Sequence, residues 1–390
     1  MWQFSIFVIY FLYEPTNQPT NQPTNQPTNQ PTNQPTHKQT RVLLILTGGT
    51  IGGQVANKKD TTTNILSFTK HIEKQKNIQI DSVLAFEPID SSEIEPKHWK
   101  CLSEIIQQNY EQYDSFVIAH GTNTMIQTAT ALSMCLGNIA KPVIMTGSQL
   151  PFDYPGTDAI SNFGNAFEVA TYDDKNIKGA VIVFHDKIIS GINAVKTSNE
   201  AYDAFRTFGE NADLGSVMGN RIKIDDRALQ IHNANFGNAK TKGELDITSD
   251  FCDDGEIQTY YTHAGFHPRT VIDDVKYKPY IKGFVFLCSG DGSPNMARME
   301  QVFEGLRDRK MPCLATSHST NGAATMTISE QGVKARELGV IPSGEFNYLT
   351  AITKMSWLIA NGCSYEKLPQ AMQADRSTAI NLCRNSQTLT

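Results

Sequence analysis

Short apolar runs recur along the chain from residue 41 onward, and each ends abruptly in glycine or in small polar residues. Because these runs are apolar at consecutive positions, they are typical of strands buried on both faces of a parallel sheet. Between them, apolar residues recur at helical spacing, as in segments 124–136 and 295–306. The predicted strands are Val42–Leu46, Phe116–Ala119, Val143–Met145, Val181–Phe184, Phe284–Cys288 and Leu314–Ala315.

The alternation of strands and helices predicts an α/β fold with right-handed crossovers. We expect a larger N-terminal domain, with a mostly parallel sheet flanked by helices, and a smaller C-terminal parallel α/β domain. Residues 225–258 are more polar than their surroundings. A domain boundary near the end of this stretch gives an N-terminal catalytic domain at 41–255 and a C-terminal domain at 256–390.

Residues 1–40 are excluded from the predicted fold. The tetrapeptide Pro-Thr-Asn-Gln repeats five times between Pro15 and Gln34, and such a polar, proline-rich repeat buries no core. The segment is therefore interpreted as a disordered, low-complexity extension. Its apolar run, Trp2–Tyr13, is too short to span a bilayer.

Composition narrows the classes of function and location. With 39% apolar residues, 19% charged residues and a net charge of −6, the chain is typical of a globular protein, and no basic cluster suggests a nucleic-acid partner. No membrane partner is expected. The cysteines are odd in number and lack zinc-ligand spacing, which favours buried free thiols in a reducing, cytoplasmic compartment. They are Cys101, Cys135, Cys252, Cys288, Cys313, Cys363 and Cys383.

Glycine and hydroxyl residues gather where the predicted strands end. Open α/β sheets bind ligands at the carboxyl ends of their strands, so a site is expected at loops 47–53, 120–124 and 147–150. In the first loop, glycines permit a sharp turn, the Thr50 hydroxyl is a candidate nucleophile, and nearby backbone N–H groups are candidate oxyanion donors. A phosphate cradle is disfavoured because both common glycine spacings are absent. A tight turn without a ligand remains an alternative.

A threonine nucleophile needs a base or a proton relay. Thr122 is a candidate relay or a second nucleophile. Lys196 is a candidate base if burial lowers its pKa, although a solvated surface lysine is the commoner situation. His120 is another candidate base, but a histidine at the end of a buried strand is more often structural.

Four motifs occur in a family-specific order: Thr47–Ile51 (TGGTI), His120–Met125 (HGTNTM), Thr146–Pro151 (TGSQLP) and Asp158–Phe163 (DAISNF). Together they resemble the bacterial-type asparaginase/glutaminase family, and the resemblance covers about residues 41–385. The segment Asp90–Ile94 is similar to the cytoplasmic, type I branch of that family.

The resemblance implies a role for each matching residue. Thr50 matches the nucleophile, Thr122 the second catalytic threonine and Lys196 its paired lysine. Ser91 matches a serine that holds the substrate α-carboxylate, and Ser92 lies near the substrate. The implied reaction converts a side-chain amide to a carboxylate and ammonia through an acyl-threonine intermediate, without a metal or an organic cofactor. A homodimer or homotetramer is also implied, with each active site closed by a neighbouring C-terminal domain.

Three departures from the family pattern concern the substrate site. Asn123 stands where the family has an aspartate that contacts the substrate ammonium, so we expect weaker ammonium binding and a more easily deprotonated Lys196. No tyrosine occurs between Ile51 and Glu95, although Thr61, Thr62 or Thr63 offers a hydroxyl. In the C-terminal domain, the family's Gly-x-Gly-Asn reads Gly-Asp-Gly-Ser, and we hypothesise that Asp291 replaces the charge lost at Asn123.

Three functions follow from these motifs. The first is hydrolysis of asparagine or a related amide, supported by Thr50, Thr122 and Lys196. The second is hydrolysis of an amide without a free α-ammonium group, suggested by Asn123. The third is a non-catalytic binding protein that uses the same pocket, or an amidotransferase-like subunit that delivers ammonia to a partner. Of these two, the amidotransferase subunit is disfavoured because no appended tRNA-binding or synthetase-like domain is visible.

Overall fold

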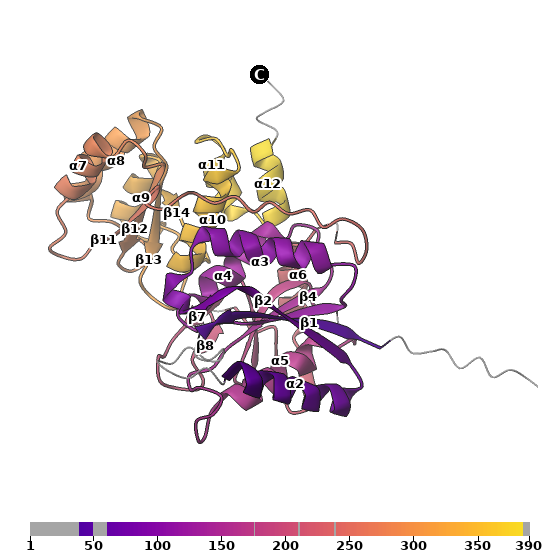
Figure 1. Cartoon of the computed structure of the whole chain (residues 1–390). Helices are drawn as coiled ribbons and strands as arrows, with labels where there is room; N and C mark the ends of the chain where they lie inside the picture. Colours follow the sequence, from indigo (N-terminus) through magenta and orange to yellow (C-terminus); the bar gives the residue numbers. More distant parts are fainter. Residues whose placement is uncertain (1–38, 50–60, 175, 210, 238, 385–390) are drawn as a thin grey trace, which may run out of the picture. The chain divides into compact units, whose positions relative to one another are not determined.

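The computed structural model describes residues 39–49, 61–174, 176–209, 211–237 and 239–384. The α/β architecture predicted from the sequence is confirmed, with a large sheet in the N-terminal part and a small parallel sheet in the C-terminal part (Figure 1). None of the described helices is long and apolar enough to cross a bilayer.

The large sheet has the strand order β10-β9-β6-β5-β4-β3-β1-β2. From β2 to β5 all neighbouring strands run parallel, whereas β6, β9 and β10 continue the sheet in antiparallel pairing. Each apolar run predicted in this part of the chain is one of the strands. Their bounds are β1 (Arg41–Gly48), β2 (Gln79–Ile89), β3 (Ser115–Ala119), β4 (Pro142–Thr146), β5 (Gly179–Phe184), β6 (Lys187–Ser190), β9 (Gly215–Met218) and β10 (Arg221–Ile224).

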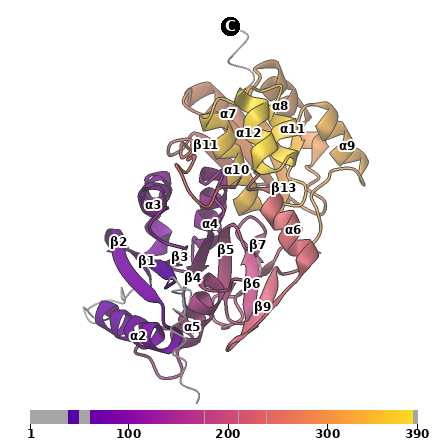
Figure 2. The ribbon, with the colours of Figure 1, turned by 90° about the vertical axis from the view of Figure 1, so that its right-hand side faces the viewer.

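Helices cover both faces of this sheet, which explains why its central strands are apolar throughout. Along β1, Leu43 and Ile45 join the core on one face, whereas Leu44 and Leu46 join the core on the other. This alternation follows from the two-residue period of a strand. The first face packs against α3 (Pro96–Asn109) and α4 (Met125–Cys135), and the second against α2 (Thr61–Lys76) and α5 (Ala159–Ala170) (Figure 2).

The small sheet has the strand order β11-β12-β13-β14, and all its neighbouring strands run parallel. One face packs on α7, α8 and α9, while Val285 and Leu314 on the other face share a core with Met355 of α10 and with α4. The bounds are β11 (Ile257–Tyr261), β12 (Gly283–Cys288), β13 (Cys313–Ser317), β14 (Ile341–Pro342), α7 (Arg269–Tyr277), α8 (Met296–Asp308), α9 (Glu330–Glu337) and α10 (Tyr348–Ala360).

Short elements connect these layers. A 3-10 turn, η1, follows β2, and the two-stranded ribbon β7–β8 lies between β6 and β9 in the chain. Two helices follow α10 at the C-terminal end of the described chain. Their bounds are η1 (Ser91–Glu93), β7 (Ala194–Lys196), β8 (Phe205–Thr207), α6 (Asp226–Ala234), α11 (Leu368–Gln373) and α12 (Arg376–Arg384).

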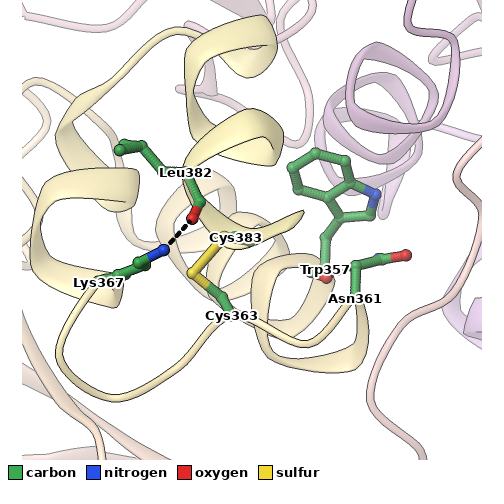
Figure 3. Close-up of a disulfide and its surroundings, with 6 residues drawn as sticks. All are labelled: Trp357, Asn361, Cys363, Lys367, Leu382 and Cys383. Carbon is green, nitrogen blue, oxygen red and sulfur yellow. Dashed lines mark hydrogen bonds between the residues drawn. A yellow bond between two sulfur atoms is a disulfide. The ribbon is translucent and has the colours of Figure 1, made fainter. Parts of the chain in front are cut away.

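A disulfide corrects the expectation that all cysteines are free. Cys363, just after α10, is bonded to Cys383 in the last turn of α12, and Lys367 donates a hydrogen bond to the Leu382 carbonyl beside it (Figure 3). The pairing escaped sequence analysis because the two cysteines lie 20 residues apart, with α11 and a turn between them. The remaining cysteines are free, and all of them except Cys101 are buried, as expected.

Candidate active site

Three loops meet at the carboxyl ends of β1, β2 and β3, and glycines allow their backbones to touch. A Cβ on Gly49 would lie 2.5 Å from the Gly121 Cα, and a Cβ on Gly121 would lie 2.5 Å from the Ser91 Oγ. Gly49 also has φ +74°, a conformation that favours glycine. The expected meeting of the loops after β1 and β3 is therefore observed, and the loop at Ser91 joins them.

The Asp90–Glu93 segment is joined to the loop after β3 by side-chain hydrogen bonds. Ser91 is buried, its Oγ accepts from the Asn123 backbone N at 3.1 Å, and its carbonyl accepts from the Thr124 Oγ1 at 2.5 Å. These bonds bring Ser91 and Asn123, both predicted from the sequence to contact substrate, into one cluster. The Ser92 Oγ donates to the Asp90 Oδ1 at 2.6 Å.

Thr122 and Lys196 are brought together from distant parts of the chain. The Lys196 Nζ, at the end of β7, donates to the Thr122 Oγ1 at 2.9 Å. Burial lowers the pKa of Lys196 below its ordinary value. A lysine with a lowered pKa is able to accept a proton from a hydroxyl to which it is hydrogen-bonded.

Asp90 is a carboxylate beside the neutral Asn123, and sequence analysis assigned it no role. Its Oδ1 accepts from the Ser92 N at 2.8 Å and from the Asn123 Nδ2 at 3.4 Å. Hydrogen bonds from the side chain and backbone of Ser92 hold the pKa of Asp90 below its usual value, so the group is an anion at neutral pH. The available signal was its place directly before Ser91 in the Asp-Ser-Ser motif.

His120 is buried, and both of its ring nitrogens have partners. Nδ1 lies 2.7 Å from the Gly121 carbonyl and Nε2 lies 3.0 Å from the Thr128 Oγ1 in α4. Burial lowers the pKa of His120 to about 4, so the ring is neutral near pH 7. Its position favours the structural alternative: it joins the end of β3 to α4.

The third predicted loop, at 147–150, is held by Asp158, the first residue of the DAISNF motif. Asp158 is buried, and its carboxylate accepts from the backbone N–H groups of Gln149 and Leu150 at 2.9–3.1 Å. The Asn162 Nδ2 donates to the same carboxylate at 3.1 Å. This arrangement explains why an aspartate and an asparagine four residues apart follow the loop at 147–150.

Thr50 and the rest of its loop, through residue 60, lie outside the described residues, as do the side chains of Thr61, Thr62 and Thr63. Asp291 is described, and its carboxylate accepts from the Ser293 Oγ and, at 3.3 Å, from the Ile328 N. Both partners belong to the C-terminal domain.

Family models match most of the chain. The asparaginase N-terminal model matches residues 41–230, and the glutaminase/asparaginase C-terminal model matches residues 256–372. The chain belongs to the asparaginase family. Membership of this amidohydrolase family confirms the resemblance inferred from the four sequence motifs.

Asparaginase-family relatives align with nearly the whole folded chain. The L-asparaginase of Thermococcus kodakarensis is 26% identical over 344 residues, which are 85% of this chain and 97% of the relative. L-asparaginase 1 of Escherichia coli K12 is 26% identical over 342 residues, covering 85% and 95%. A glutamyl-tRNA(Gln) amidotransferase component of Saccharolobus solfataricus is 24% identical, covering 88% and 77%.

Solved asparaginase structures share the fold. The thermostable L-asparaginase from Thermococcus kodakarensis superposes with a TM-score of 0.74 at 26% identity, covering 86% of this chain and 98% of that one. L-asparaginase I from Vibrio cholerae gives a TM-score of 0.72 at 23% identity, covering 86% and 98%. The two-sheet architecture is therefore the fold of this family.

Proposed function

We propose that this protein hydrolyses the side-chain amide of L-asparagine to L-aspartate and ammonia through an acyl-threonine intermediate on Thr50. The observation that carries the proposal is the hydrogen bond between Lys196 and Thr122 beside the loop that leads to Thr50. The names of the relatives, which include L-asparaginases from an archaeon and a bacterium, support the same substrate.

In the proposed first step, the Thr50 hydroxyl oxygen attacks the amide carbon and its proton leaves through a relay. Neutral Lys196 accepts the Thr122 proton, which leaves the Thr122 oxygen able to receive a proton in turn. Backbone N–H groups of the glycine loops stabilise the oxyanion. The C–N bond then breaks, the amide nitrogen leaves as ammonia after protonation, and water hydrolyses the threonine ester to release aspartate.

For the substrate end of the site, we propose that Ser91 binds the α-carboxylate and that Ser92 and Asn123 border the α-ammonium group. Asp90 supplies the negative charge that Asn123 lacks. Its Oδ1 is occupied by donors from Ser92 and Asn123, whereas Oδ2 has no hydrogen-bond partner in the described part of the chain. An ammonium group bound at Oδ2 gains a charge-assisted hydrogen bond.

The second candidate function is hydrolysis of an amide that lacks a free α-ammonium group. Asn123 favours it, because an amide side chain attracts an ammonium less than the family aspartate does.

We also propose, from family membership, that the enzyme is a cytoplasmic homodimer or homotetramer.

Ammonia release by the full-length protein tests the proposal, with asparagine, glutamine and N-acetylasparagine as substrates. We expect asparagine to be hydrolysed and Thr50→Ala to abolish the activity. Thr270→Ala, which removes an exposed threonine of α7, serves as the matched control and should leave activity unchanged. Release from N-acetylasparagine alone would support the second candidate. No release from any amide, or release that survives Thr50→Ala, would reject the proposed enzyme or its nucleophile.

A further inference from the structure

The strand that carries Lys196 has little sheet structure around it. β7 is three residues long and, among the described strands, pairs only with β8. A two-stranded ribbon is at best marginally stable by itself. The position of Lys196 therefore depends on contacts that hold β7 from outside the ribbon.

Asn347, the N-cap residue of α10, makes one of these contacts. It is buried, and its Oδ1 accepts from the backbone N of Leu349 and of Thr350 at 2.9 and 3.1 Å. Its Nδ2 donates to the Thr350 Oγ1 at 3.0 Å and, outside α10, to the Ala194 carbonyl at 2.7 Å. Since both amide hydrogens and the carbonyl oxygen are used, the orientation of Asn347 is determined.

A second contact, made through α4, holds the turn that precedes β7. The Thr350 Oγ1 lies 3.3 Å from the Thr130 Oγ1, which donates to the Gly191 carbonyl at 3.0 Å. Gly191 and Ala194 flank the turn between β6 and β7, so the network holds this turn at two points. Figures 1 and 2 both place α10 against α4, the helix that begins just after Thr122.

We propose that Asn347 is a positioning residue that sets the hydrogen bond between Lys196 and Thr122 by holding β7 against α10. The effect of Asn347 on catalysis rests on the proposed function. Asn347 touches neither the reacting atoms nor Lys196 itself, since its bond is to the Ala194 carbonyl, two residues earlier in β7. Without that bond, the short ribbon has one anchor fewer and the Lys196 amine becomes more accessible to water.

Burial lowers the pKa of Lys196, and the charged groups on the neighbouring elements are not the cause. α4 contains no charged residue, and in α10 the Lys354 Nζ donates to the carbonyls of Met372 and Ala374. In β8, Arg206 is paired with Val195, so it projects from the opposite face of the ribbon to Lys196. On the η1 side the charged residues are Asp90 and Glu93. Greater exposure of the amine should therefore raise its pKa.

Asn347→Ser tests the proposal because serine also caps a helix but is too short to reach the Ala194 carbonyl. Asn361→Ser is the matched control: Asn361 ends the same helix, and its Nδ2 donates to the Asp250 carbonyl at 2.9 Å. We expect Asn347→Ser to lower kcat for asparagine by about 10- to 100-fold, as small displacements of catalytic groups do. KM should change by less than about threefold, because the proton relay is not a binding group. Asn361→Ser should leave both constants unchanged.

A second measurement is independent of activity. The pH dependence of Lys196 labelling by an amine-reactive reagent, read by mass spectrometry of the full-length protein, gives the lysine pKa. We expect this pKa to rise in Asn347→Ser and not in Asn361→Ser.

If Asn347→Ser does not fold, Thr130→Val removes the second contact with little change in shape and should give the same rise. An unchanged Lys196 pKa in the folded variant overturns the proposal. A wild-type protein that releases no ammonia rejects the proposed function, while labelling still decides whether Asn347 positions Lys196.

Discussion

Among single residues, the site contains a lysine and a carboxylate whose pKa values are both lowered, with opposite effects on their charge. Burial disfavours the charged form of Lys196, and hydrogen bonds from Ser92 favour the charged form of Asp90. The first group is thereby suited to accept a proton and the second to attract a cation. Asn123 stands beside Asp90 and contributes no charge of its own.

Lys196→Arg should abolish the proton relay while keeping the positive charge. Arginine stays protonated at all accessible pH values, so we expect kcat to fall by at least about 100-fold. In the wild type, Lys196 is a base only when neutral, so kcat should rise with pH through a pKa below the usual value for lysine. Initial rates between pH 6 and pH 10 measure both effects. An arginine variant with wild-type kcat and the same pH profile would contradict the role of Lys196 as a base.

Asp90→Asn should raise KM for asparagine by about tenfold, because the substrate ammonium loses its anionic partner. N-acetylasparagine has no ammonium group, so its KM should not rise. Asp291→Asn tests the hypothesis made from the sequence that Asp291 supplies this charge. A rise in KM for asparagine with Asp291→Asn and not with Asp90→Asn would reverse the assignment.

At the scale of elements, the C-terminal helices join the two sheets. α10 packs between the small sheet and α4, and the disulfide ties the residue after α10 to the end of α12. Arg376, at the start of α12, is buried and donates from Nε to the Met134 carbonyl of α4 at 3.0 Å. The disulfide therefore supports a helix that contacts the N-terminal domain directly.

Breaking this disulfide should destabilise the protein without touching the site. Cys363→Ala combined with Cys383→Ala should lower the free energy of unfolding by about 2–4 kcal/mol, because the unfolded chain regains the entropy of the closed loop. Denaturant titration with and without dithiothreitol measures the effect, and Cys101→Ala, which removes a free thiol, is the control. A wild-type midpoint that dithiothreitol does not lower would show that the two thiols are unpaired in solution.

At the scale of the whole molecule, the C-terminal domain contributes α10 to the core around α4, while its Asp291 loop bonds within its own domain. The sequence resemblance implies that a neighbouring C-terminal domain closes each active site, and homo-oligomerisation stays a prediction.

The purified full-length protein should form a homodimer or a homotetramer. Sedimentation equilibrium should give two or four times the mass of the chain, and specific activity should fall on dilution as protomers separate. A monomer with full activity at every concentration would show that the site is complete within one chain.

The strands and helices were predictable because their signals are local. Consecutive apolar residues in Val42–Leu46 and helical spacing in 124–136 require burial on particular faces, whatever the final topology. The glycines of the loop at 47–53 likewise indicated a sharp turn, and strand polarity placed this loop and the one at 120–124 at one edge of the sheet. The residue motifs were specific enough to identify the family.

Only the tertiary structure decided which distant groups meet. Thr122 and Lys196 are 74 residues apart; the family resemblance implies that they pair, but nothing local to either predicts their hydrogen bond of 2.9 Å. The contact of Asp90 with Asn123, the reach of Asn347 to the Ala194 carbonyl and the pairing of Cys363 with Cys383 depend in the same way on helices and strands packing together. Periodicity specifies which face of an element is buried, whereas the packed core specifies which side chains face one another.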